Sequence, residues 1–280
     1  MDPMKIGCTI PAERTHGIIE KISSKKKVDI NYEEFKDRYI YSFSLKKKTS
    51  QDGFDTSDIA AQFANEMIME FYISDLIKKR YRELLFNKKN INTKQLLKQI
   101  YLLTRNESLF NSERIRIESE IHDFIMANNI LIVDGYLRFR PRSFNNLIDR
   151  AMDIALNQRQ IEMEYDEFIN MLKYFIDTNP PEIDLVNLII RNKDFELLDS
   201  RNKKINNKSI VEMLEGVFQG DINKSDIILS SLIGLSPKQI IVHVCQGESE
   251  ELIEILRKIF THRIKICYGC SLCGNKQYKD

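Results

Sequence analysis

Helix-breaking residues are scarce in this chain, and tryptophan is absent from it. Its 280 residues include ten glycines and six prolines, and neither type occurs in residues 54–134 or in residues 142–179. Glycine and proline are the strongest local breakers of regular structure. Because both blocks lack them, we expect these two stretches to be mostly helical.

Three further absences narrow the class of protein. No segment approaches the run of about 20 apolar residues that a membrane span requires, and the first residues lack the charged-then-apolar pattern of a secretion signal. Five cysteines are too few for a disulfide scaffold in a chain of this length. Clustered thiols in a reducing compartment are more often metal ligands, redox groups or plain thiols. We therefore expect a cytoplasmic protein without a membrane span.

Neither a charge excess nor a catalytic signature is present. The 42 basic and 41 acidic side chains leave a net charge of +1, whereas a protein that coats a duplex usually carries a marked basic surplus. The chain has no phosphate-binding loop, dinucleotide fingerprint, nucleophile elbow or zinc-protease helix, and its four histidines are scattered. Bulk charge therefore does not favour nucleic acid, and the chain supports a binding protein better than an enzyme.

The spacing of apolar residues predicts an α+β protein in three parts. Residues 1–48 form a small β-rich region, because Val28 to Tyr32 and Tyr39 to Leu45 alternate as half-buried strands do. Residues 55–180 form a helical body, in which apolar residues recur at intervals of three and four. Residues 181–280 return to an α/β pattern.

A hairpin is predicted inside the helical body. Ile130 to Val133 and Tyr136 to Phe139 flank the dipeptide Asp134-Gly135, which is a strong two-residue turn signal. We expect these two segments to pair as antiparallel strands.

Arginines alternate with other residues at the end of this hairpin and just beyond it. Arg138, Arg140 and Arg142 are separated by Phe139 and Pro141. Arginine and aromatic side chains interleaved in this way could neutralise phosphates and stack on bases. Outward-facing arginines on an ordinary strand explain the pattern equally well, so nucleic-acid binding is an alternative interpretation.

The C-terminal region contains a strand, a helix and a strand in that order. Gln239 to Val244 is a nearly continuous apolar run, as in a strand buried on both faces. A helix follows from Glu248 to Ile259, with acidic residues at its start and basic residues at its end. Arg263 to Cys267 is the closing strand. This order predicts a βαβ unit, whose parallel strands end at the same edge of the sheet.

The strongest chemical candidate is the cysteine knuckle, Cys267 to Cys273. Its cysteines, Cys267, Cys270 and Cys273, have the two-residue spacing that lets thiolates converge on one metal ion, and Gly269 permits a tight turn between them. Zinc and an iron–sulfur cluster are the candidate cofactors. A ferredoxin-type run would place a fourth cysteine where this chain has Gln277. Three ligands are therefore one short of a closed site.

The βαβ unit suggests where a fourth group could come from. Cys245 follows the first strand and Cys267 ends the second, so Cys245 could be the fourth ligand or a disulfide partner. His243 and His262 are less favoured ligands. A redox or regulatory thiol is another interpretation, and unliganded cysteines are the simplest one.

Three segments in order carry a resemblance to a known family. They are residues 135–140 (Gly-Tyr-Leu-Arg-Phe-Arg), residues 164–169 (Glu-Tyr-Asp-Glu-Phe-Ile) and the cysteine knuckle. Together they resemble the YtxC family of sporulation proteins from endospore-forming bacteria, over most of the chain. The resemblance implies a link to sporulation, and it carries no activity, cofactor or catalytic residue.

These observations lead to three functional hypotheses. The first is a non-enzymatic, sporulation-associated factor that binds another macromolecule, with a protein partner favoured over nucleic acid. The second is a metal- or iron–sulfur-containing redox or sensor protein that uses the C-terminal cysteines. The third is a nucleic-acid-binding protein that uses Arg138, Arg140 and Arg142.

Overall fold

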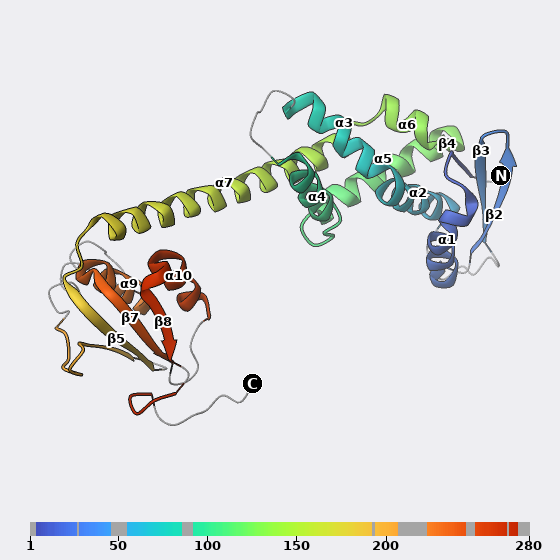
Figure 1. The fold of residues 1–280 in the computed structure, drawn as a ribbon. Helices are drawn as coiled ribbons and strands as arrows, with labels where there is room; N and C mark the ends of the chain where they lie inside the picture. The colour runs from blue at the N-terminus through green and yellow to red at the C-terminus, as the bar shows by residue number, and fades with distance from the viewer. Residues whose placement is uncertain are drawn as a thin grey trace. The chain divides into compact units, whose positions relative to one another are not determined.

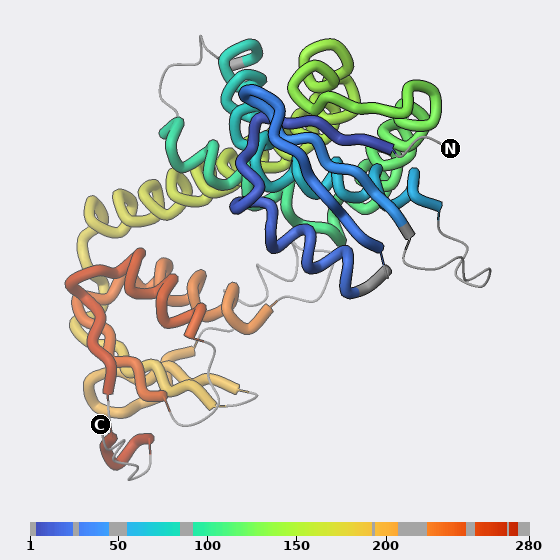
Figure 2. The backbone as a smooth tube through the Cα atoms, turned by 90° about the vertical axis from the view of Figure 1, so that its right-hand side faces the viewer, coloured from blue at the N-terminus to red at the C-terminus, as the bar shows by residue number. Residues whose placement is uncertain are grey.

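The computed structural model describes residues 4–26, 28–45, 55–85, 92–191, 194–206, 223–244, 250–267 and 269–273. The chain divides into two compact units, which we call the N-terminal unit (residues 1–160) and the C-terminal unit (residues 161–280). Each unit contains a four-stranded mixed sheet and its own apolar core (Figures 1 and 2). The α+β class expected from the sequence is confirmed, with strands at both ends and helices between.

The N-terminal unit combines a sheet of order β2-β3-β1-β4 with the helices of the middle of the chain. Its strands are β1 (Lys5–Cys8), β2 (Val28–Phe35), β3 (Arg38–Leu45) and β4 (Ile130–Ile132). Its helices are α1 (Ala12–Lys26), α2 (Thr56–Met67), the π-helical turn η1 (Ile68–Tyr72), α3 (Ile73–Leu85), α4 (Thr93–Thr104), α5 (Asn111–Asn128), α6 (Val133–Phe139) and the first part of α7 (Arg142–Thr178).

Aromatic side chains join this sheet to the helices. The alternation seen in the sequence places Tyr41 and Phe43 on the buried face of β3, where they are 0% and 2% exposed. Both rings pack on Phe63 of α2, with centroid separations of 4.9 and 5.4 Å. Aromatic pairs at such distances contribute beyond their buried area, so this contact is central to the N-terminal core.

The hairpin predicted around Asp134-Gly135 is wrong in its second strand. The first segment does form β4, but β4 pairs in parallel with β1, and the following residues form the short helix α6. Val133, Tyr136 and Leu137 are its buried residues, and their spacing of three and four is helical, not alternating. Burying these three apolar side chains on one helix face therefore favours a helix here over the hairpin that the turn signal predicted.

The C-terminal unit contains a sheet of order β6-β5-β7-β8. Its strands are β5 (Ile183–Arg191), β6 (Asp194–Leu198), β7 (Pro237–Val244) and β8 (Ile264–Cys267). Its described residues include four helical elements, which are the end of α7, α9 (Lys224–Leu235), α10 (Glu250–Phe260) and the 3₁₀ turn η2 (Thr261–Arg263). Strand β7 lies parallel to and beside β8, with α10 between them in sequence, so the predicted βαβ unit is confirmed.

Alternation along the strands gives this second sheet two unlike faces. One face packs on α9, α10 and the end of α7, and its strands contribute Val186, Leu188, Ile190, Ile240 and Val242 to the core. Figures 1 and 2 show α9 and α10 together on that side. Residues one position along each strand, such as Asn187, His243 and Cys267, point to the opposite face. Among the described residues, α9, α10 and the end of α7 therefore pack on one face, and the candidate site lies on the other.

Candidate metal centre

The two strand residues of the site are partners in the sheet. His243, near the end of β7, is in register with Cys267, the last residue of β8. Partners on adjacent strands project from the same face and lie close together. The βαβ topology therefore delivers an imidazole and a thiol to one point, at the carboxyl edge of the parallel strands.

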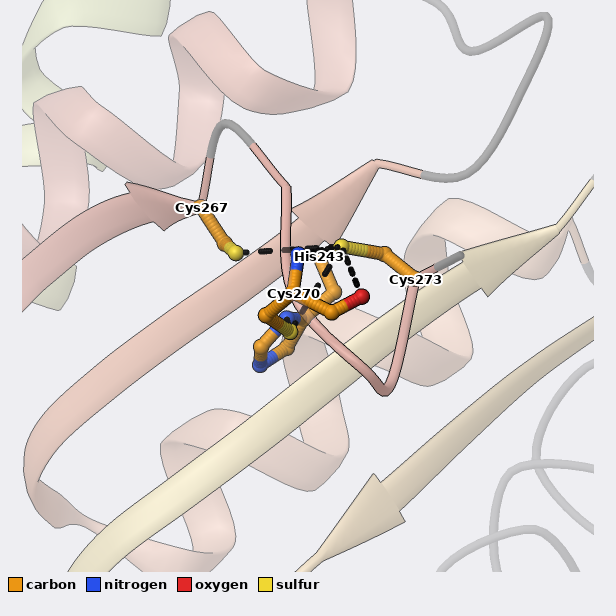
Figure 3. A group of neighbouring side chains, drawn as sticks. All are labelled: His243, Cys267, Cys270 and Cys273. Carbon is orange, nitrogen blue, oxygen red and sulfur yellow. Dashed lines mark hydrogen bonds between the residues drawn. The ribbon is translucent and has the colours of Figure 1, made fainter. Parts of the chain in front are cut away.

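The cysteine knuckle brings two more thiols to this point. Gly269 has a φ of 147°, a conformation that side-chain-bearing residues rarely adopt, which lets the chain turn directly after β8. In the turn that follows, the backbone N–H of Cys270 donates to the Sγ of Cys273 at 3.1 Å, and the N–H of Leu272 donates to the Sγ of Cys270 at 3.4 Å. The backbone thereby aims the sulfur atoms inward, as Figure 3 shows.

Three of the separations within this group of four side chains are close to those expected around one metal ion. All four ligand atoms lie within 4.8 Å of one another. Cys273 Sγ is 3.6 Å from Cys270 Sγ and 3.7 Å from Cys267 Sγ, and His243 Nδ1 is 3.3 Å from Cys270 Sγ. A tetrahedral ion with sulfur at about 2.3 Å and nitrogen at about 2.05 Å separates two sulfurs by about 3.8 Å, and sulfur from nitrogen by about 3.5 Å. The group could therefore hold a metal ion.

Hydrogen bonds orient the imidazole of His243. Its Nε2 lies 3.2 Å from Oδ1 of Asn187 on β5, and both side chains are buried. The Nδ2 of Asn187 donates to the backbone carbonyl of Asp199 at 3.2 Å, which turns the amide oxygen of Asn187 toward the ring. Nε2 is then the protonated nitrogen, and Nδ1 presents its lone pair toward Cys270. Metal-binding histidines are commonly oriented in this way by a second hydrogen bond.

The electrostatics of the group suit a cation. Burial lowers the pKa of His243, so its imidazole is neutral at neutral pH, which is the form that binds metals. Burial, reinforced by the neighbouring thiols, raises the pKa of Cys267 to about 11. Burial also opposes ionisation of Cys270, but backbone hydrogen bonds from Leu272 and Cys273 lower the pKa of Cys270 below its ordinary value. Adjacent thiolates repel one another, and a bound cation would remove that cost.

The fourth member of the group in the structure is His243, whereas the sequence favoured Cys245. Cys267, Cys270 and Cys273 come together, and the fourth position is occupied by His243, which the sequence made only a secondary candidate. Cys245 lies outside the described residues. His262 is in η2, where its Nδ1 lies 3.1 Å from the Thr261 hydroxyl, and it is not part of the group. Alternation along the strand makes His243 a candidate beside Cys245, and the strand register identifies His243 as the partner of Cys267.

The arginines considered for nucleic-acid binding do not share a strand. Arg138 is in the last turn of α6, Arg140 follows that helix, and Arg142 begins α7. The guanidinium of Arg138 lies 5.8 Å from the ring centre of Phe139, and that of Arg140 lies 5.3 Å from the ring centre of Phe124. All three arginines are exposed, and they come from the end of one helix, the connection after it and the start of the next helix instead of from one strand.

Comparisons with known proteins assign a family. The sequence profile of the YtxC-like family matches residues 57–265, about three quarters of the chain, so the chain belongs to the YtxC-like family. It is similar to the uncharacterized protein YtxC of Bacillus subtilis (strain 168), with 20% identity over 162 residues. This match covers 57% of the present chain and 56% of that relative, so the chain spans about half the length of the curated protein it matches.

The matched range contains His243 and ends two residues before Cys267, so the knuckle lies beyond it. No solved structure matches the chain. Among the described residues, no helix combines the length and the apolar character needed to cross a membrane.

Proposed function

We propose that this protein is a non-enzymatic factor whose C-terminal unit binds one zinc ion through Cys267, Cys270, Cys273 and His243. The observation that carries the proposal is the set of ligand separations, 3.6 and 3.7 Å between sulfurs and 3.3 Å between sulfur and nitrogen. Three cysteines and one histidine are a common ligand set of structural zinc sites.

The number of protein ligands supports a structural role for the ion. Catalytic zinc sites use three protein ligands and leave one position for water or substrate, whereas structural sites are closed by four. Here four side chains gather within 4.8 Å of one another. The ion would tie the knuckle to the sheet face opposite α9 and α10. Zinc bound in this way contributes directly to the free energy of folding.

An iron–sulfur cluster fits the same residues less well. A cluster distributes its thiolate ligands over two or more iron atoms, so thiolates on different irons stand farther apart than thiolates on one ion, whereas all three sulfurs here lie within 4.8 Å of one another. The sulfur separations of 3.6 and 3.7 Å match two edges around a single metal. A redox or sensor protein that uses one iron ion remains the alternative function, and the same measurement distinguishes the two metals.

Metal analysis of protein purified without oxygen tests the proposal. We expect one equivalent of zinc per chain, no visible absorption band, and a cobalt-substituted form with the intense thiolate charge-transfer and d–d bands of tetrahedral cobalt. The His243→Ala variant should lose most of the metal, and Cys270→Ser should lose all of it.

Matched controls exist for both substitutions. His262→Ala removes a histidine of the same unit that is not in the group, and Cys8→Ala removes a buried thiol of the other unit. Both variants should retain a full equivalent of zinc. Coloured protein that contains iron would support the alternative, and metal-free protein that folds normally would remove both interpretations.

The wider role is the one that the family resemblance implies, a sporulation-associated factor that binds a macromolecule. A closed metal site and the lack of catalytic motifs support binding over turnover. Deletion of the gene in the source organism should lower the yield of heat-resistant spores, and the wild-type gene should restore it. Parental spore yield in the deletion strain would remove the sporulation part of the proposal and leave the zinc site untouched.

Nucleic acid is the less favoured partner. If it were the ligand, retention on heparin or RNA at low salt should decline when Arg138, Arg140 and Arg142 are neutralised together. Equal retention by the wild type and the triple variant would dismiss these arginines as the contact.

A further inference from the structure

A second candidate site lies in the N-terminal unit and is independent of the metal centre. A cavity of about 390 Å³ opens between α1, α2, the π-turn η1, α5 and the connection between α4 and α5. Its volume falls in the range of small-molecule pockets, and most of the side chains that line it are polar or charged. We call it the polar pocket.

Three buried polar atoms without hydrogen-bond partners belong to side chains that line the polar pocket. Among the described residues, five buried side-chain nitrogen or oxygen atoms have no hydrogen-bond partner, and three of them belong to residues that line this cavity. They are Oε1 of Gln62, Oδ1 of Asn65 and Nε of Arg114. Asn65 is 7% exposed. Buried polar groups in native proteins are nearly always hydrogen-bonded to protein or to ordered water, so these three atoms call for partners, water or ligand, that the protein atoms do not supply.

The charged side chains of the rim are already paired. Lys21 contacts Glu66 at 2.7 Å, and Arg105 contacts Glu70 at 2.7 Å. Arg114 lies 3.8 Å from Glu107 and donates from Nη2 to a backbone carbonyl at 3.0 Å. These charged side chains therefore already have ion-pair partners. The groups that still lack a hydrogen-bond partner are two acceptor oxygens, from Gln62 and Asn65, and one donor N–H, from Arg114.

The π-turn η1 lies at the same cavity. Met69 and Glu70 of this turn line the pocket, and Nη1 of Arg105 donates to the backbone carbonyl of Met69 at 3.2 Å. Single π-turns inside α-helices are rare and occur frequently at functional sites. This irregularity is a second observation, separate from the unpartnered atoms, that marks the same place.

We propose that the polar pocket binds a free α-amino acid. The ammonium group of such a ligand donates to Oε1 of Gln62 and Oδ1 of Asn65, and its carboxylate accepts from Nε of Arg114. A simple anion is disfavoured, because the lining carries four glutamates against one lysine and two arginines. An apolar ligand would leave all three atoms unpaired.

Calorimetric titration of the full-length protein with each of the twenty amino acids tests the proposal. At least one should bind with one-to-one stoichiometry. The matching amine without a carboxylate and the matching acid without an amine should each bind at least about tenfold more weakly, since each leaves a buried group unpaired. No binding by any amino acid would overturn the proposal and leave bound water as the content of the cavity. Equal binding of the amine alone would overturn it in favour of a simple cation site.

Two substitutions locate the binding to these atoms. Gln62→Leu and Asn65→Leu each remove an unpartnered oxygen, so the ligand-free protein should keep its melting temperature while its affinity for the amino acid falls about tenfold or more. Gln95→Leu makes the same change at an exposed position on α4 outside the pocket and should bind like the wild type. Unchanged affinity in both pocket variants would place the ligand elsewhere and overturn the proposal. If Asn65→Leu does not fold, Gln62→Leu gives the result alone.

Discussion

The two units use the same side chain, cysteine, in opposite ways. In the N-terminal unit, Cys8 lies at the end of β1, fully buried in an extensive apolar core that includes Tyr41 and Phe43. Burial raises the pKa of its thiol to about 11, so it behaves as a small apolar group. In the C-terminal unit, three thiols gather with a histidine on the sheet face opposite α9 and α10. Cysteine therefore packs in the apolar core of the first unit, whereas in the second unit it joins a group that could hold a cation.

The largest expected effect is that of metal removal on the C-terminal unit alone. Because each unit has its own core, we expect the C-terminal unit to lose about 5 kcal/mol or more of its free energy of unfolding when zinc is chelated, since the binding energy of structural zinc is folding energy. Hydrogen exchange should show the amides of β7 and β8 losing protection while those of β1 and β3 keep theirs. Equal loss of protection in both units would contradict the separation.

A core substitution should produce the reverse pattern. Phe63→Ala removes the ring that packs on Tyr41 and Phe43 and should lower the free energy of unfolding of the N-terminal unit by about 3–5 kcal/mol. Zinc content should stay at one equivalent. Phe139→Ala, at a side chain that is 80% exposed, is the matched control and should change stability by less than about 0.5 kcal/mol. Loss of zinc from Phe63→Ala would show that the units are coupled.

A smaller effect is expected from the residue that orients the imidazole. Asn187→Ala removes the hydrogen bond to Nε2 of His243 and should lower zinc affinity about 10- to 100-fold, as is typical for partners of metal-binding histidines. Competition with a chelator of known affinity measures the change. The substitution should leave the stoichiometry at one ion, and affinity equal to the wild type would show that sheet packing alone positions the ring.

The smallest effect concerns the pH dependence of Cys8. Its thiol has a raised pKa of about 11 when folded and an ordinary value of 9.0, so the unfolded chain releases this proton first. The contribution of Cys8 to stability is therefore complete below about pH 9 and is lost as the pH rises toward 11. Between these values the wild type should lose stability faster than Cys8→Ala in denaturant titrations. Parallel pH profiles would show that the thiol does not titrate with folding.

Much of the architecture was predictable because it rests on patterns that are local in sequence. Alternation over Val28 to Tyr32 and Tyr39 to Leu45 identified strands, and the order of the last three elements identified the βαβ unit. The sequence did not predict helix α6, because the turn signal at Asp134-Gly135 suggested that β4 would pair with the residues just after it. In the structure β4 pairs instead with β1, more than 100 residues earlier in the chain. No residue pattern marks the π-turn η1, which depends on tertiary packing.

The sequence predicted the three cysteines of the candidate site, but it did not identify the fourth residue of the group. The two-residue spacing of the cysteines identified the knuckle from the sequence. The fourth group depended on which residue of β7 lies opposite Cys267, and only the register of the strands gives His243. Cys245 has the same parity along the chain, so counting alone could not separate the two residues.

Because His243 pairs with Cys267, metal binding by the proposed site would be a check on how the sheet was assembled. Strand β8 is at the edge of its sheet and is four residues long, and short edge strands have few contacts to hold their alignment. A slip by one residue would turn Cys267 to the other face of the sheet, away from His243, and the four ligands could not meet. Zinc would therefore be retained only by chains whose edge strand has settled in the correct alignment, which makes zinc content a measure of correctly folded protein.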